Sequence, residues 1–139
     1  MKWMFAMLVV LFPVTLPAQA VQWFTVTGDR NDSSVDTTEL DVSTVQKNAS
    51  LRTFRFRVSL SKPRQDAAGQ TYQSYLSHIT VDCNTSSIFH DDQVRYRNSG
   101  WTGPEQHETF AQPKPMAFGG LVPDPRQRLL AAACHPRFR

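Results

Sequence analysis

The chain has 139 residues, the length of one domain, and its 40% apolar and 19% charged residues are typical of a folded chain rather than a disordered one. The formal net charge of +3 does not indicate nucleic-acid binding, which usually goes with a concentrated basic stripe. Two cysteines are too few for a disulfide-dense small scaffold or for a zinc site made of four cysteines.

Residues 1–20 have the pattern of a secretory signal peptide. Lys2 supplies a positive start, residues 3–12 form an uncharged apolar run, and Ala18-Gln19-Ala20 is a small-residue cleavage site. A membrane anchor is the alternative, but the run is shorter than the roughly 20 apolar residues that cross a bilayer. We therefore expect export, a single mature domain over residues 21–139, and no transmembrane segment within it.

The first half of the mature chain predicts strands separated by turns. Residues 21–26 are rich in β-branched and aromatic side chains, which favours a first strand. A second strand is expected to end near Asp41, before a turn at 47–50. Residues 51–60 form the clearest element, because a period of two predicts a strand with one buried face. Its alternate positions are apolar: Phe54, Phe56, Val58 and Leu60.

Two further strands follow a hairpin loop. They are expected over residues 71–83 and 88–97, with Asp91 and Asp92 marking a bulge or break in the second one. Alternation places three residues of that second strand on one face: Ile88, Val94 and Tyr96.

The C-terminal part predicts an irregular segment and then a helix. Residues 98–123 contain four prolines and four glycines, with room for a short edge strand at 116–118. Asp124 suits an N-cap and Pro125 the first helical position. Apolar residues then follow at helical spacing from Leu129 to Cys134.

These elements predict an α+β fold in which an antiparallel sheet of about five or six strands is packed by one C-terminal helix. The helix has one apolar stripe and the sheet one strongly apolar face, and packing them together buries both. An exported chain with two cysteines also predicts one disulfide, Cys83–Cys134, with two buried free thiols as the alternative.

The polar residues show no catalytic motif. His90-Asp91-Asp92 is the tightest polar cluster and has the residue types to ligate a metal or orient a base, but a solvated strand end is the favoured interpretation. Asp41 is interpreted as a cap for the following backbone rather than a ligand contact. We therefore expect no enzyme activity, no cofactor and no metal site.

Four arginines are the candidate binding residues. Arg55, Arg57, Arg95 and Arg97 occupy the polar positions of two predicted strands. If these strands are neighbours, a positive face results that suits acidic glycans or acidic protein segments. The alternative is an ordinary solvated face whose charge blocks edge-to-edge aggregation.

Several short motifs occur in an order that resembles the surface-adhesin protein E-like family of exported bacterial proteins. They are Leu40-Asp41-Val42-Ser43-Thr44-Val45, the alternating strand 54–60, Tyr72 through Asp82-Cys83, Leu121-Val122-Pro123, and the terminal Cys134. The resemblance covers nearly all of the mature chain. It implies a small sheet packed on a C-terminal helix, export, and adhesion to host proteins.

The sequence as a whole thus predicts an exported, non-enzymatic binding or adhesion module of the bacterial cell envelope. Its expected location is the periplasm or the outer cell surface, and its expected partners are host extracellular-matrix proteins or anionic glycans, not nucleic acid. The alternative is a periplasmic structural or accessory envelope protein without an external ligand.

Overall fold

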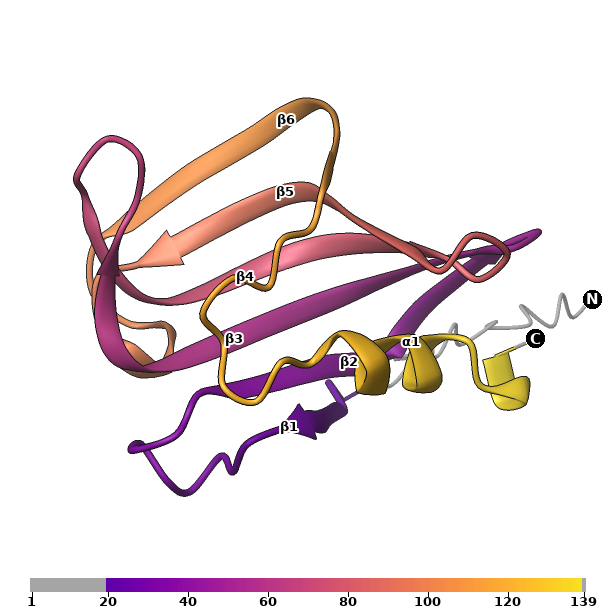
Figure 1. Ribbon diagram of the computed structural model, residues 1–139, viewed down its shortest axis with the longest axis horizontal. Coiled ribbons are helices and arrows are strands. Elements are labelled where there is room, and N and C mark those ends of the chain that lie inside the picture. The colour runs from indigo at the N-terminus through magenta and orange to yellow at the C-terminus, as the bar shows by residue number, and fades with distance from the viewer. Residues whose placement is uncertain (1–19, 139) are drawn as a thin grey trace, which may run out of the picture.

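The computed structural model describes residues 20–138 and shows six strands in one antiparallel sheet (Figure 1). The predicted signal peptide, apart from its last residue, lies outside the described residues. Neighbours in sequence are neighbours in the sheet, in the order β1-β2-β3-β4-β5-β6. The strands are β1 Trp23–Thr27, β2 Thr37–Asn48, β3 Leu51–Gln65, β4 Thr71–Asp82, β5 Ser87–Tyr96 and β6 Glu105–Pro115.

Three short helical elements complete the fold. The 3-10 helix η1, Ser99–Trp101, connects β5 to β6, and η2, Pro136–Phe138, follows the α-helix α1, Arg126–Ala133. Within the described part of the chain, no helix is long and apolar enough to cross a membrane. The predicted fold class, including the sheet of about six strands and the C-terminal helix, is confirmed.

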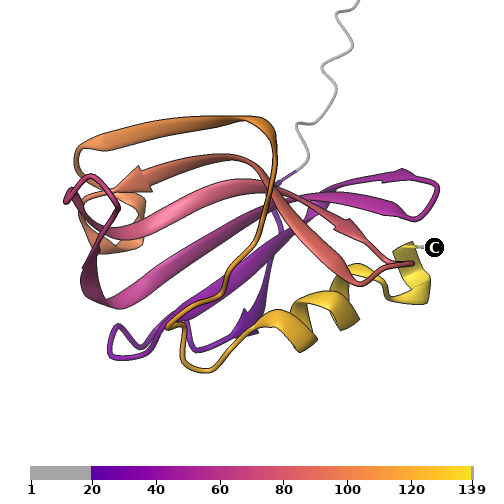
Figure 2. The same cartoon turned by 45° about the horizontal axis from the view of Figure 1, so that its top comes forward.

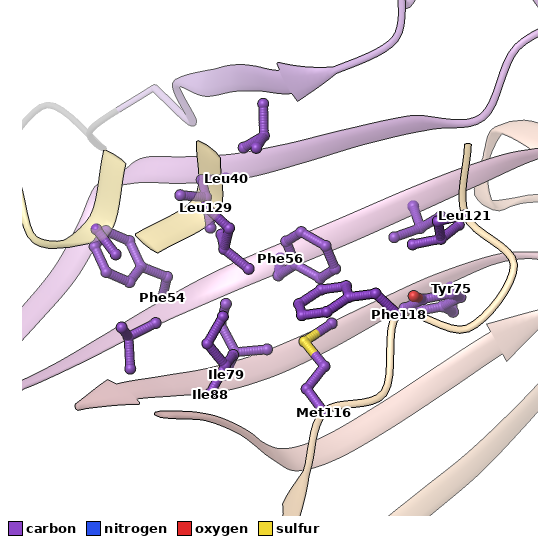
Figure 3. Packing of buried hydrophobic residues seen from close by; sticks show 14 of the residues in the cluster. Leu40, Phe54, Phe56, Tyr75, Ile79, Ile88, Met116, Phe118, Leu121 and Leu129 are labelled. Carbon is purple, nitrogen blue, oxygen red and sulfur yellow. The ribbon is translucent and has the colours of Figure 1, made fainter. Parts of the chain in front are cut away.

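One face of the sheet, here called the inner face, holds the core. The alternation predicted for β3 is confirmed, because Phe54, Phe56, Val58 and Leu60 are at most 2% exposed. Residues 116–121, here called the strap, run from β6 across this face to α1 (Figure 2). Figure 3 shows Leu129 of α1 among Leu40, Phe54 and Phe56, and the strap residues Met116 and Phe118 beside them.

The helix and the disulfide follow the sequence prediction, but the helix cap lies one residue later than expected. Pro125, not Asp124, is the N-cap, and its carbonyl oxygen accepts the backbone N–H of Leu129 at 2.8 Å. The Asp124 carboxylate still accepts a hydrogen bond from the backbone N–H of Arg126 at 2.9 Å. Leu129 and Ala133 are fully buried. Cys83, directly after β4, is bonded to Cys134 at the end of α1, with Cα atoms 5.7 Å apart. The bond ties the end of the helix to the sheet.

Two strand boundaries and one strand differ from the prediction, and the short edge strand expected at 116–118 is not formed. β2 does not end near Asp41 but continues to Asn48, with its register to β3 shifting between Asp41 and Gln46. β3 runs on to Gln65 through the expected loop. The segment expected to be irregular contains the 11-residue strand β6. β6 is an edge strand, and an edge strand tolerates prolines because it pairs on one side only.

A bulge in β5 changes which side chains share a face. Ile79 pairs with His90 while the adjacent His78 pairs with Asp92, so Asp91 is the extra residue. A one-residue insertion reverses the alternation beyond it. The predicted bulge is confirmed, but the expectation that Ile88, Val94 and Tyr96 share a face is wrong. Ile88 lies on the inner face, and the other two lie on the opposite, outer face.

Candidate functional site

The structure does not bring the four candidate arginines together. Arg55 and Arg57 pair in register with His78 and Leu76 and point to the outer face. Arg95 pairs with the buried Tyr75 and therefore lies on the inner face. Arg97 is exposed just beyond the end of β5. The single basic face expected from alternation is not formed. The bulge at Asp91 reverses which side chains of β5 point inward, so Arg95 lies on the face opposite to Arg55 and Arg57.

On the outer face, the guanidinium of Arg57 lies between two tryptophans. Its central carbon is 4.0 Å from the ring centroid of Trp23 and 3.9 Å from that of Trp101. Both distances fall within the range of cation–π attraction. Trp23 comes from the first strand, whereas Trp101 comes from η1. The indole N–H of Trp101 also donates to the carbonyl oxygen of Tyr75 at 3.2 Å. Arg57 thus joins distant parts of the chain.

Two fully buried carboxylates lie beneath these arginines. Glu39 accepts hydrogen bonds from Arg57 Nε at 2.7 Å and from Arg30 Nη2 at 2.5 Å. Arg55 Nη1 lies 3.7 Å from Asp41 Oδ2. Burial lowers the pKa of the Arg57 guanidinium, and the Glu39 carboxylate opposes this effect. Each of these guanidinium groups therefore has a carboxylate of the protein beside it.

Asp41 has the structural role predicted for it. Its Oδ1 atom accepts hydrogen bonds from the backbone N–H of Ser43 at 3.0 Å and from the Ser43 hydroxyl at 2.5 Å. These bonds hold the chain at the point where the register of β2 changes.

Apolar and aromatic side chains surround the paired arginines. Leu76, Val94 and Tyr96 are half-buried on the same face of β4 and β5. The strap and α1 both lie on the inner face, so they leave these residues uncovered (Figure 2). This surface is here called the outer patch and consists of Trp23, Arg55, Arg57, Leu76, Val94, Tyr96 and Trp101.

The polar cluster His90-Asp91-Asp92 is separated by the same bulge. Asp92 faces outward, with Oδ2 2.8 Å from His78 Nδ1, and Asp91 accepts a hydrogen bond from the Thr80 hydroxyl at 2.8 Å. Across residues 20–138, no group of three or more His, Cys, Asp or Glu side chains is placed to hold a metal ion.

His90 itself is buried on the inner face. Its Nδ1 lies 2.7 Å from Ser77 Oγ, and the Ser77 hydroxyl donates to the carbonyl oxygen of Asp92 at 2.5 Å. Burial lowers the pKa of His90 to about 4, and the nearby positive charges of Lys114 and Arg95 act in the same direction. The imidazole is therefore neutral at physiological pH.

The lowered pKa predicts an acid-sensitive fold. The folded chain binds the proton on His90 only near pH 4, whereas the unfolded chain binds it near pH 6.5. Between these values the unfolded state holds more protons, so the free energy of unfolding falls as the pH falls. For His90→Gln, we expect the loss on going from pH 7 to pH 4.5 to be about 2 kcal/mol smaller than for the unchanged protein.

Urea melts at the two pH values measure this difference. His107→Gln is the matched control, because the His107 side chain is 68% exposed and should leave the pH dependence as it is. Equal pH dependence in His90→Gln and the unchanged protein would contradict the prediction.

Comparison with known proteins now identifies the family. The sequence profile of the family described as Surface-adhesin protein E matches residues 23–135. The chain belongs to this family. The resemblance predicted from the residues is confirmed, and the match extends from the first residue of β1 to just beyond the disulfide.

Solved structures of protein E from Haemophilus influenzae are similar to the chain. Protein E from a non-typeable strain is 11% identical, with a TM-score of 0.44, covering 86% of this chain and 99% of that one. The Se-Met form of Haemophilus influenzae protein E is 9% identical, with a TM-score of 0.46, covering 71% of this chain and 79% of that one. No curated protein sequence matches the chain.

Family membership indicates the general role. A family of surface adhesins acts by binding, and this agrees with the non-enzymatic binding module expected from the sequence.

Proposed function

We propose that the protein is an adhesin displayed on the outer cell surface, and that its outer patch binds a host extracellular-matrix protein. Family membership supports the adhesin role. The observation that carries the assignment of the patch is the Trp23–Arg57–Trp101 stack on a sheet face that neither α1 nor the strap covers.

The composition of the outer patch suits a protein partner. Trp, Tyr and Arg are the residue types that most often dominate protein–protein binding energy. Here Arg57 is already held by two rings and by Glu39. Binding would therefore order few additional side chains, which lowers the entropy cost of association.

The buried carboxylates argue against an anionic glycan at this patch. The Glu39 carboxylate lies 2.7 Å from the Arg57 guanidinium, and the Asp41 carboxylate lies 3.7 Å from the Arg55 guanidinium. A ligand that relied on the positive charge would have to compete with these carboxylates. Binding through the apolar and aromatic surface instead predicts an affinity that changes little with salt, since salt screens exposed charges and not buried apolar area.

Two neighbouring residues allow a matched test. In Trp23→Ala, we expect affinity for the bound matrix protein to fall at least tenfold, because the change removes one wall of the Arg57 stack. Phe24→Ala should leave affinity unchanged, because alternation points the 52% exposed Phe24 to the other face. Surface plasmon resonance against a panel of purified extracellular-matrix proteins, at low and high salt, gives both readouts.

The outcomes separate the proposal from its alternative. Equal affinity of the two variants, both folded, would place the contact elsewhere on the protein. Absence of binding to every matrix protein, together with resistance of the protein to protease added to intact cells, would favour a periplasmic accessory protein. Release of its peptides from intact cells supports display on the outer surface.

A further inference from the structure

A cavity on the inner face has the features of a separate binding site. It has a volume of about 180 Å³ and lies between the strap and strands β4 to β6. The rings of Tyr72, Phe110 and Phe118 line it, and so do the polar residues His90, Gln93 and Lys114. It is on the opposite side of the sheet from the outer patch, so the two sites can be tested independently.

His90 presents a hydrogen-bond acceptor to this cavity. The Ser77 hydroxyl donates its hydrogen to the carbonyl oxygen of Asp92, so Ser77 Oγ accepts the hydrogen on His90 Nδ1. A neutral imidazole carries only one hydrogen, and Nε2 is therefore a lone-pair acceptor. Nε2 makes no hydrogen bond to any of the residues that the structure describes. Among the described residues, Nε2 is not one of the buried side-chain atoms that lack a partner, so it is accessible from the cavity that His90 lines, and a ligand that brings a donor can hydrogen-bond to it.

Lys114 presents a positive charge beside this acceptor. It pairs in register with His90, and its Nζ lies 5.3 Å from the Phe110 ring centroid. No carboxylate of the described residues lies within 4.0 Å of Nζ. The neighbouring cations differ, since Asp36 pairs with Arg64 at 3.0 Å and Asp66 pairs with Arg95 at 3.0 Å. Lys114 is therefore the group in this cavity that is ready to pair with an anion.

Gln93 adds a donor. Its Oε1 atom accepts a hydrogen bond from Arg95 Nε at 3.0 Å, which leaves the amide NH₂ group to donate to a ligand. The cavity thus offers one cation without a carboxylate partner, one amide donor, one accessible acceptor and aromatic walls, while its second cation, Arg64, is paired with Asp36. A sulfate ion would satisfy the cation and the donor but would bring no hydrogen to His90 Nε2.

We propose that this cavity binds an acidic sugar ring, that is, a pyranose carrying one carboxylate, at the end of a glycan. The carboxylate pairs with Lys114, a ring hydroxyl donates to His90 Nε2, and the Gln93 amide donates to a ring oxygen. The apolar face of the sugar packs against Tyr72 and Phe110. Hexuronic acids and sialic acids share this chemistry.

The dimensions restrict the ligand to a terminal unit. Pockets that enclose drug-sized ligands begin at about 300 Å³, so this cavity holds a single ring. The cavity adjoins an open groove of about 520 Å³ that runs past the loop 66–70. Tyr72, Gln93 and Lys114 line both the cavity and the groove. The remainder of a glycan can leave through this groove.

Titration of the whole mature protein with four compounds tests the proposal. They are the methyl glycoside of glucuronic acid, the methyl glycoside of N-acetylneuraminic acid, methyl glucoside and acetate. Calorimetry measures the affinity, and the NMR signal of the Gln93 side-chain amide reports binding in the cavity. We expect one of the acidic sugars to bind at least tenfold more tightly than methyl glucoside and acetate, and to shift the Gln93 signal. Which one binds identifies the source of the sugar.

Matched variants locate the site. Lys114→Gln should weaken binding at least tenfold, whereas Lys47→Gln, the same change at the far end of β2, should not. His90→Phe keeps an aromatic ring in place but removes Nε2, and should also weaken binding. Trp23→Ala should bind the sugar normally, so this proposal and the proposed function fail separately.

Three results would overturn the proposal: no binding of either acidic sugar, equal binding of methyl glucoside or acetate, or an unchanged affinity in Lys114→Gln. The Gln93 signal of the unaltered protein decides the question even if His90→Phe does not fold.

Discussion

Replacing Phe56 by alanine is expected to lower the free energy of unfolding by about 3–5 kcal/mol. Phe56 is fully buried at the middle of the inner face, where its ring lies 6.5 Å from that of Tyr75. The strap and α1 cover it from the other side (Figure 3). Its removal loses apolar burial and also leaves a cavity, because close-packed neighbours relax only partly into the space.

Denaturant melts of the purified variant measure this loss. Arg128→Ala is the control, because Arg128 is exposed on α1 and ordinary surface changes stay within about 0.5 kcal/mol. An equal effect of the two changes would contradict the central place given to Phe56. A smaller slope of the free energy of unfolding against denaturant concentration would indicate instead that the unfolding is no longer cooperative.

The success of the prediction for β3 and its failure for β6 have one physical cause. β3 has a paired strand on each side and one face against the core, so Phe54 and Phe56 must alternate with polar residues. β6 is an edge strand with most of its side chains exposed, and it therefore carries little hydrophobic alternation. Pro113 and Pro115 suggested an irregular segment, although prolines are compatible with an edge.

The prediction of a single basic face formed by four arginines failed for a different reason. Alternation is reliable only while the strand keeps its period, and one extra residue reverses every position beyond it. Asp91 is that residue, and the polar pair Asp91-Asp92 was the only sign of it in the sequence. The bulge moves Arg95 to the inner face, where it pairs with Asp66 and Glu108 beside the open groove.

The residues that the sequence reasoning missed depend on the register between strands. A glutamate is seldom fully buried without a partner, so Glu39 is expected at the surface when it is considered alone. The pairing of β2 with β3 places Arg57 directly opposite it. Opposite charges at directly paired positions stabilise a sheet, and this cross-strand match was the available signal. Trp101 reaches Arg57 from η1, a contact that no local pattern could reveal.

Removing the disulfide by the double change Cys83→Ser and Cys134→Ser is expected to lower the free energy of unfolding by about 4 kcal/mol. The bond joins residues separated by 51 positions, and the freedom that it removes from the unfolded chain grows with the length of the loop. The double change avoids leaving a single thiol that could pair between molecules.

Loss of the disulfide should loosen α1 before it affects the central strands. α1 has eight residues, well below the roughly 12–15 residues that an isolated helix needs in water. It is held by the buried Leu129 and Ala133 and by the bond at its C-terminal end. Without the disulfide, hydrogen exchange in α1 should become faster than in β3 and β4, because the central strands retain their pairing on both sides.

Urea melts and hydrogen exchange of the unchanged, the reduced and the doubly substituted protein test both effects. The reduced protein should match the double variant, and thiol labelling of the denatured, unreduced protein should find no free cysteine. Stability within about 1 kcal/mol of the unchanged protein would mean that α1 is held by packing alone, since chain entropy predicts a much larger loss. Equal acceleration of exchange in α1 and β3 would show that helix and sheet open as one unit, and the disulfide would then act on the whole domain rather than on the attachment of its helix.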